Sequence, residues 1–275
     1  MTVLYELVGV QVPGKPRTVW KFGDPGCPLR LAQTPTGLGG AKFKHSRQSN
    51  ARQPGATWRG RVDEINLIKL ALRIGPVTEG APALALWHSW RASLGRGEAL
   101  AEFHVRSPGG GDRFQWVRLE EAVPDPDLTG LEWNGYMDEE VILAGDFPWW
   151  IGEAFERTYT PAQFAGLTIT NAGDVPSWPY VELTGPGTFT FGVGTEAIVL
   201  PAIGPGQKWR IETDDEAPFV RNAAGADVWD QLGPKAWFQN VPANDTVPLN
   251  LSVTGAGAGT SALIRLPQMF ERAAA

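Results

Sequence analysis

Eight short apolar runs, separated by Gly and Pro, fill residues 167–266, and they limit the fold more than any other feature of the chain. Within most runs apolar and polar residues alternate, as in strands that bury one face. The runs are LTIT (167–170), YVELT (180–184), TFTFGV (188–193), EAIVL (196–200), QKWRIET (207–213), APFV (217–220), VPLNLSV (247–253) and SALIRL (261–266). Because no helical segment alternates with them, an α/β fold is disfavoured. The pattern predicts an antiparallel β-sandwich.

The segment NAGDVPSWPYVELTGPG, residues 171–187, predicts the turn by which the chain enters this sandwich. Asn171 and Gly173 can adopt positive φ, and prolines fix φ and remove a donor. The alternating run 180–184 then reads as a strand that Gly185 closes. We therefore interpret Asn171, Gly173, Pro179 and Gly185 as the sandwich-entry turn. Trp178, close to two prolines, is the one tryptophan that we expect to be exposed.

The first half of the chain has a different pattern of secondary structure, with a long strand and a helix. Residues 68–74 alternate as a half-buried strand that ends at Gly75-Pro76, and residues 82–95 place Leu84, Trp87, Trp90 and Leu94 at helical spacing. A glycine-rich turn at 108–112 predicts a hairpin, and another strand ends near Pro148. The fold class is thus mainly β. We expect a β-rich domain with one short helix over residues 1–155 and a sandwich over residues 156–275, with the boundary between 153 and 166.

Charge is unevenly divided along the chain. Residues 1–60 carry nine Lys or Arg against Glu6 and Asp24, which is a net charge of +7. Because the whole chain has a net charge of −6, residues 61–275 carry −13. Between Pro28 and Gly60 the sequence has few large apolar residues and no acidic one, which predicts an extended arm that is ordered only against a partner. Its basic residues are candidate assembly contacts, since complementary charges steer association. They are Lys42, Lys44, Arg47, Arg52 and Arg59.

Two other interpretations of this charge stay open: a solvated loop without a specific partner, and nucleic-acid binding, which the acidic remainder and the lack of a binding motif disfavour. The single cysteine, Cys27, excludes an internal disulfide framework. The N-terminus lacks a basic region followed by an apolar core, and no apolar run approaches the ~18 residues of a membrane helix. We expect a chain made in a cytosol and not inserted in a membrane.

No arrangement of residues predicts catalysis, a cofactor or a metal. The acidic neighbours Glu120-Glu121, Glu139-Glu140 and Asp214-Asp215-Glu216 could supply a glycosidase pair, but successive residues of a strand point to opposite faces. The three histidines, His45, His88 and His104, are far apart, and Cys27 has no CxxC companion. Neither a G-x-S-x-G elbow nor a phosphate-binding glycine motif is present. The sequence therefore predicts a protein that is not an enzyme.

Several motifs, taken in order along nearly the whole chain, resemble the distal tail (Dit) proteins of siphophages, of the type found as minor tail proteins in actinobacteriophages. The motifs are Arg52-Gln53-Pro54-Gly55 before the long strand, Ala144-Gly145-Asp146-Phe147-Pro148-Trp149-Trp150, Asn171-x-Gly173 with Pro179 and Gly185, and Phe238 ahead of Val241-Pro242 and LNLSV. The resemblance implies an N-terminal belt domain that forms a ring and a C-terminal galectin-like sandwich.

The resemblance also implies a function and a set of partners. The chain would form a homohexameric ring at the distal end of a long non-contractile tail, made in the cytoplasm of the bacterial host and assembled into the virion. Its partners would be other copies of itself, the tail tube protein, the tail-tip hub or baseplate, and the tape measure protein, without specific nucleic acid. A second hypothesis is a carbohydrate-binding module of the tail tip that contacts the host envelope, with host carbohydrate as its ligand.

Overall fold

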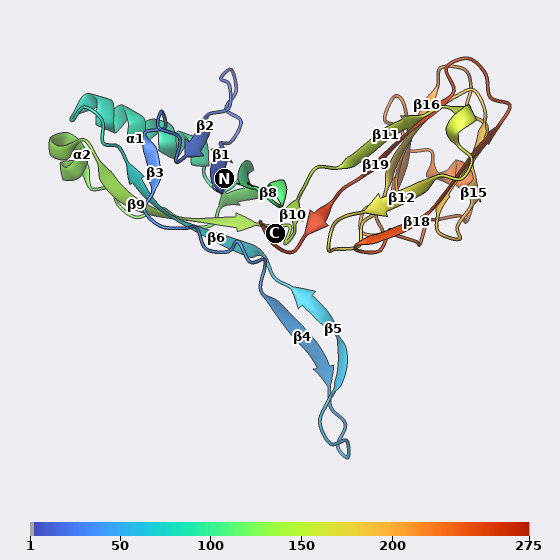
Figure 1. Ribbon diagram of the computed structural model, residues 1–275, viewed down its shortest axis with the longest axis horizontal. Helices are drawn as coiled ribbons and strands as arrows, with labels where there is room; N and C mark the ends of the chain where they lie inside the picture. The colour runs from blue at the N-terminus through green and yellow to red at the C-terminus, as the bar shows by residue number, and fades with distance from the viewer. Residues whose placement is uncertain (1–2, 275) are drawn as a thin grey trace. The chain divides into compact units, whose positions relative to one another are not determined.

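The computed structural model describes residues 3–274 and divides into two compact units, which Figure 1 draws in one view. Unit 1 extends to Trp150 and takes in the chain again from Glu271, whereas unit 2 extends from Ile151 to Phe270. The division lies a few residues before the boundary expected at 155. The sequence did not predict that the chain returns to unit 1 from Glu271 onward.

The chain consists mainly of short strands, so the predicted mainly β fold class is confirmed. In unit 1 the elements are β1 (Leu4–Val8), β2 (Val19–Phe22), β3 (Leu29–Leu31), β4 (Phe43–Gln48), β5 (Thr57–Asp63), β6 (Asn66–Ile74), α1 (Ala81–Leu94), β7 (Ala101–Ser107), β8 (Gly111–Leu119), α2 (Leu128–Asn134) and β9 (Met137–Gly145). Then come β10 (Trp150–Ile151), β11 (Phe155–Tyr159), the 3-10 helix η1 (Pro161–Gln163), β12 (Thr168–Asn171), β13 (Tyr180–Thr184), β14 (Thr188–Val193), β15 (Ile198–Val199), β16 (Lys208–Glu212), β17 (Phe219–Asn222), η2 (Trp229–Leu232), β18 (Asp245–Thr254), β19 (Ser261–Leu266) and β20 (Met269–Phe270).

Unit 1 is built on an antiparallel sheet with the strand order β2-β1-β7-β8-β9-β6-β3. Strand β6 pairs along its whole length with β9, from Asn66 opposite Gly145 to Ile74 opposite Met137. The side chains of Ile68, Leu70 and Leu72 are buried, as the period of two in the sequence predicts. The long alternating run is thus one of the central strands of the sheet.

Helix α1 is held to this sheet by a buried carboxylate. Trp90, fully buried, donates its indole Nε1–H to Glu139 Oε1 at 2.9 Å, and Trp87 donates to Glu139 Oε2 at 3.2 Å. Glu139 lies on β9, so these bonds join the helix to a central strand. Burying this carboxylate is tolerated because both indoles and the nearby Arg91 guanidinium face it.

The prediction of one helix is wrong, because α2 is a second one. Asp127 caps its N-terminus by accepting a hydrogen bond from the backbone N–H of Gly130 at 2.9 Å. Gly135 ends it with φ at 69°, the left-handed region that favours glycine. The sequence around it, DLTGLEWNG, carries both signals, but its seven helical residues are too few for a clear period. Among the described residues, no helix has the length and apolarity needed to cross a membrane.

Unit 2 is a two-sheet sandwich. One sheet has the order β11-β19-β13-β16-β17 and the other the order β12-β18-β14-β15, and neighbouring strands in both sheets are antiparallel. The side chains of Val181, Ile211 and Ile264 on the first sheet and of Phe189 and Phe191 on the second belong to one buried core. Seven of the eight predicted runs coincide with β12, β13, β14, β16, β17, β18 and β19. The run EAIVL forms only the two-residue β15, and β11 was not predicted.

The sandwich-entry turn is held by a buried network of hydrogen bonds around Asn171. Asn171 has no exposed surface, and its Nδ2 donates to the carbonyls of Val175 at 2.8 Å and Val241 at 3.1 Å. Its Oδ1 accepts from the backbone N–H of Gly173 at 2.8 Å. The prediction of positive φ for Asn171 and Gly173 is wrong, since neither is among the described residues with positive φ. Glycine is needed at 173 for space, because a Cβ there would lie 2.4 Å from the Met269 carbonyl oxygen.

The later residues of the turn also have structural roles. The Pro179 carbonyl accepts a hydrogen bond from Thr213 Oγ1 at 2.8 Å. A Cβ on Gly185 would lie 2.4 Å from the carbonyl oxygen of Gly204, so a side chain there would displace the neighbouring loop. Trp178, predicted to be exposed, is half-buried.

Candidate assembly interface

The basic arm expected between Pro28 and Gly60 is largely a β-hairpin. Strands β4 and β5 pair from Phe43 opposite Asp63 to Gln48 opposite Thr57, with a bulge beside Ser46 and Arg47. Every residue of β4 is exposed, and the hairpin projects away from the unit 1 sheet in Figure 1. The expectation of an arm without structure of its own is therefore wrong for this stretch. The alternation of FKHSR and WRGRV around Pro54-Gly55 was the missed hairpin signal.

All five predicted contact residues are exposed and lie on or next to this hairpin. Lys42 precedes β4, Lys44 and Arg47 lie on β4, Arg52 lies in the turn at the tip, and Arg59 lies on β5. The structure thus brings them onto one projecting element.

The five cations differ in what they contact. Lys44 forms an ion pair with Glu64, and Arg59 donates from Nε to Gln48 Oε1 at 2.8 Å. In residues 3–274, Lys42, Arg47 and Arg52 have no ion pair or side-chain hydrogen bond. Three cations of the hairpin are therefore available to an acidic partner.

The Lys44–Glu64 pair lowers the pKa of the Glu64 carboxyl, chiefly through the hydrogen bond from the ammonium group, and raises the pKa of Lys44 for the same reason. Lys44 is exposed and Glu64 is partly exposed, so screening by solvent and salt weakens the attraction. The pair adjusts the charge of the hairpin base more than it stabilises the fold.

One face of the hairpin carries an aromatic cluster that the sequence analysis missed. Phe43 and His45 pack edge to face at 5.3 Å between ring centroids, and Trp58 donates from Nε1 to His45 Nδ1 at 3.0 Å. The Arg61 guanidinium lies 4.2 Å from the Phe43 ring centroid. The side chains of Phe43 and Trp58 nevertheless keep 48% and 61% exposure. We call Phe43, His45, Trp58 and Arg61 the hairpin aromatic cluster. Exposed aromatic residues with arginine are the composition of protein interfaces.

The base of the hairpin is joined to the C-terminal residues of unit 1. Arg61 donates from Nη1 to Glu271 Oε1 at 2.7 Å and from Nε to Asp63 Oδ1 at 2.6 Å. The Ala273 backbone N–H donates to the Leu38 carbonyl at 2.9 Å. Beside this junction lies a largely apolar cavity of about 470 Å³, to which the half-exposed side chains of Ile65 and Leu67 contribute. The base offers an apolar surface next to the cations.

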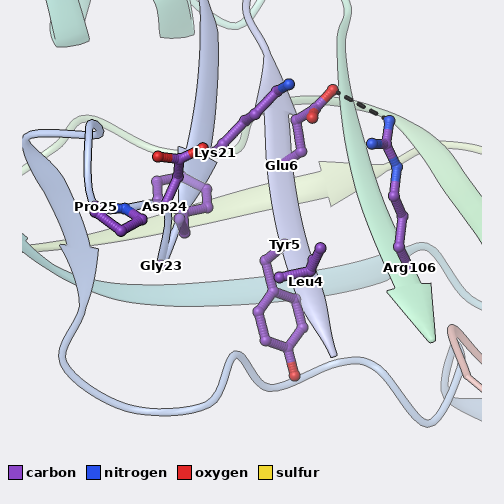
Figure 2. A pocket seen from close by; sticks show the side chains of 9 residues that line it. Leu4, Tyr5, Glu6, Lys21, Gly23, Asp24, Pro25 and Arg106 are labelled. Atoms are coloured by element: carbon purple, nitrogen blue, oxygen red, sulfur yellow. Dashed lines mark ion pairs between the residues drawn. The ribbon is translucent and has the colours of Figure 1, made fainter. Parts of the chain in front are cut away.

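A second cavity of unit 1, of about 360 Å³, lies between β1, the turn after β2, and β7 (Figure 2). Glu6 faces Arg106 across it, with 3.5 Å between Oε1 and Nη2. Lys21 and Asp24 add one charge of each sign. Its nine lining residues include no Ser, Thr, Cys or His, so it lacks the groups of a Ser-His or Cys-His pair.

Glu139 and Glu140, two of the acidic neighbours considered for catalysis, point to opposite sides of β9. Glu139 is buried beneath α1, whereas Glu140 pairs with Lys69 at 2.6 Å on the exposed side of β9. This placement follows the alternation of a strand. Asp214 accepts a hydrogen bond from the Glu216 backbone in a turn after β16.

The histidines and the cysteine are dispersed as well. His45 lies in the hairpin aromatic cluster, His88 contacts the Trp87 ring, and His104 lies between Glu102 and Asp112, 3.1 Å from each. Cys27 is a partly buried free thiol whose pKa is raised by burial. Over residues 3–274 no group of His, Cys, Asp and Glu has the arrangement of a metal site.

Comparison with known proteins identifies the fold. No protein-family model and no curated protein sequence matches the chain. Among solved structures it is similar to the Dit protein of phage SPP1, described as a paradigm of the hub adsorption apparatus in phages that infect Gram-positive bacteria. The TM-score is 0.63 at 10% identity, over 98% of this chain and 100% of that one.

It is also similar to a chain of the phage P2 baseplate in its activated conformation, with Ca and with Sr. Each match has a TM-score of 0.56 and 10% identity, over 98% of both chains. At such identities the likeness establishes a shared fold. The predicted resemblance to distal tail proteins is confirmed at that level, and the narrower actinobacteriophage type stays a prediction.

Proposed function

We propose that this chain is a structural protein of a phage tail that forms a ring, expected to be a hexamer, at the distal end of the tail tube. The ring joins the tube to the tail-tip hub or baseplate. The observation that carries the proposal is the full-length likeness to the SPP1 Dit protein, which covers 98% of this chain and 100% of that one. A likeness across both units, and not across one common domain, favours a shared mode of assembly.

Within this proposal the hairpin of β4 and β5 contacts a neighbouring copy or the tube. An isolated two-stranded hairpin is marginally stable in water, so packing against a partner adds stability that the hairpin lacks alone. Lys42, Arg47 and Arg52 are unpaired within the described residues, and the rest of the chain after residue 60 has a net charge of −13. A neighbouring copy therefore supplies the acidic surface that the hairpin needs. Closure into a ring satisfies every copy in the same way.

The function that we propose is assembly and not catalysis, because Glu140 is paired with Lys69 and the charged cavity of unit 1 has no Ser-His or Cys-His pair among its lining residues. The predicted partners keep their places in this proposal: further copies of the chain, the tube, the hub and the tape measure protein.

Mass measurement of the purified full chain tests the ring. Light scattering coupled to size exclusion should give about six times the 29.8 kDa of the chain, and negative-stain images should show rings. A monomer at all concentrations, both alone and with the tube protein, would contradict the proposal.

The role of the hairpin is tested by reversing its three unpaired cations together, Lys42→Glu, Arg47→Glu and Arg52→Glu. Ring formation or tube attachment should be lost while the melting temperature stays within a few degrees, because all three side chains are exposed. The matched control reverses Arg157, Arg221 and Lys235, which are exposed in unit 2 and change the net charge equally. If both triple variants assemble equally well, the hairpin is a surface feature only.

A further inference from the structure

The two outward faces of the unit 2 sandwich differ sharply in charge. On the five-stranded sheet, Glu182 pairs with Lys208 at 2.5 Å and with Arg210 at 3.3 Å, and Arg265 pairs with Glu156 at 2.6 Å. These residues alternate with the buried Val181, Ile211 and Ile264 and so face away from the core. This face is an ion-paired solvent surface of the ordinary kind.

The outward face of the four-stranded sheet is uncharged. Its residues alternate with the buried Ile169, Phe189, Phe191, Leu249 and Leu251. The pairing places Thr170 beside Thr246, Thr190 beside Ser252 and Thr188 beside Thr254. The residues of this face on β12, β14 and β18 are Thr168, Thr170, Thr188, Thr190, Thr246, Pro248, Asn250, Ser252 and Thr254, and the exposed Val199 of β15 lies beside Thr190. We call it the hydroxyl face.

A shallow hollow of about 400 Å³ lies on the hydroxyl face. Polar atoms come from Thr190, Asn250 and Ser252, and apolar surface comes from Leu167 and Pro248 at the same hollow. None of its lining residues is charged; they are Phe164, Ala165, Gly166, Leu167, Thr190, Ala197, Pro248, Leu249, Asn250, Leu251 and Ser252. The volume falls within the range of small-ligand sites.

The polar groups of the hollow are held in place but not used up. Asn250 donates from Nδ2 to the carbonyls of Gly194 at 3.0 Å and Glu196 at 2.7 Å, which fixes the orientation of its amide. Both amide hydrogens are then engaged, and Oδ1 remains an acceptor. Within residues 3–274 the hydroxyls of Thr190 and Ser252 have no hydrogen-bond partner. One fixed acceptor and two groups that both donate and accept thus converge beside apolar surface.

We propose that this hollow binds one neutral sugar unit. A ring with several hydroxyls can donate to the fixed Asn250 Oδ1 and exchange hydrogen bonds with Thr190 and Ser252, while its C–H surface packs on Leu167 and Pro248. A charged ligand finds no opposite charge there and loses hydration without compensation. The inference does not depend on ring formation, since the site lies within unit 2.

Nuclear magnetic resonance titration of the full-length chain tests the site, with glucose, galactose and N-acetylglucosamine as neutral probes and glucuronate as the charged one. At least one neutral probe should shift the amide signals of Thr190, Asn250 and Ser252 in a saturable way, and glucuronate should bind at least tenfold more weakly. Thr190→Glu should lower the affinity for the neutral probe at least tenfold. Thr184→Glu, the matched change on the ion-paired face, should leave the affinity unchanged.

Two sources of a neutral sugar are separated by a second arm, in which dextran and amylose replace the free sugars. Binding of a polymer with the same shifted signals places the site on a surface polysaccharide, and binding of free sugar alone identifies a small soluble ligand. The absence of saturable shifts with every neutral probe and polymer overturns the inference, as does equal binding by Thr190→Glu and the unchanged chain. Either result leaves the ring proposal intact, because ring formation is measured separately by mass.

Discussion

The β4–β5 hairpin and the sandwich-entry turn are both polar, turn-rich segments, yet they have opposite places in the molecule. Asn50, at the hairpin tip, is exposed, and its side chain makes no hydrogen bond within the described residues. Asn171, in the entry turn, is fully buried and takes part in three hydrogen bonds. The same residue type is a surface group in one segment and a structural tie in the other.

This difference shows that turn composition identifies where the chain bends but not what the bend contacts. A buried polar group must find partners, so the entry turn is tied to residues far along the chain, such as Val241. An exposed turn is satisfied by water and can change without affecting stability. The entry turn should therefore be sensitive in folding assays and the hairpin in assembly assays.

The largest effect on stability is expected from Gly173→Ala. The new Cβ would lie 2.4 Å from the Met269 carbonyl oxygen and 2.8 Å from the Met269 nitrogen, both backbone atoms that cannot rotate away. We expect a loss of about 3–5 kcal/mol or failure to fold, measured by denaturant unfolding. Gly39→Ala is the control, since a Cβ at that position meets no atom within 4 Å. Equal stability of the two variants would show that the turn can relax.

A smaller loss is expected from Asn171→Ala, which removes three hydrogen bonds of the buried turn. The Val241 carbonyl still accepts from the Ser177 N–H, and the Gly173 N–H still donates to Gln268 Oε1, so the main cost falls on the Val175 carbonyl. We expect about 2–3 kcal/mol, in line with the cost of unsatisfied buried polar groups. Asn50→Ala at the hairpin tip should change the unfolding free energy by less than about 0.5 kcal/mol. Chemical denaturation measures the unfolding free energy of both variants, and similar losses in the two would contradict the difference between the buried and the exposed turn.

A third effect concerns Glu212 at the end of β16, whose carboxyl pKa is raised by partial burial. The raised pKa means that the stability linked to this group is complete below its unfolded pKa and is lost as pH rises through the folded pKa. Glu212→Gln should therefore raise the free energy of unfolding near pH 7, by less than about 1 kcal/mol once solvent screening is allowed for. Thermal melts from pH 4 to 8 check this, and a variant that is less stable at pH 7 would contradict it.

The smallest effect compares two carboxyls whose pKa values are lowered mainly by a lysine hydrogen bond: Glu64 by Lys44 at the hairpin base, and Glu182 by Lys208 in the sandwich. Each pair stabilises above the unfolded pKa of its glutamate and is lost as pH falls through the folded pKa. Lys44→Ala should return the Glu64 pKa close to its ordinary value. Lys208→Ala should raise the Glu182 pKa only in part, because Arg210 still contacts Glu182. Carboxyl chemical shifts during acid titration measure both.

Much of the architecture could be predicted from local pattern. The alternation in β6 and in most of the sandwich strands appears in the residues themselves, because a strand with one buried face requires it. Helix α1 followed from helical spacing between a proline and a glycine. Helix α2 and strand β11 did not, since the seven residues of α2 are too few to display a helical period, and the β11 sequence FERTY has three consecutive polar residues in place of an alternation.

The basic residues of the candidate interface were predicted from the sequence, but the hairpin that carries them was not. The five cations were chosen for their charge, and the hairpin places all five on one element. The hairpin aromatic cluster was missed because Phe43, His45 and Trp58 come together only through cross-strand pairing. The hydroxyl face was missed for a similar reason, as its residues come from separate strands of one sheet.

By itself, the sequence determined a mainly β chain of two halves, a basic N-terminal region and the lack of a catalytic motif, because these depend on residues close together along the chain. Tertiary structure decided which turn is buried, which carboxylates are paired, and where uncharged hydroxyls gather. Those properties arise between residues as distant as Asn171 and Val241, or Arg61 and Glu271, and burial sets the cost of leaving each of them without a partner.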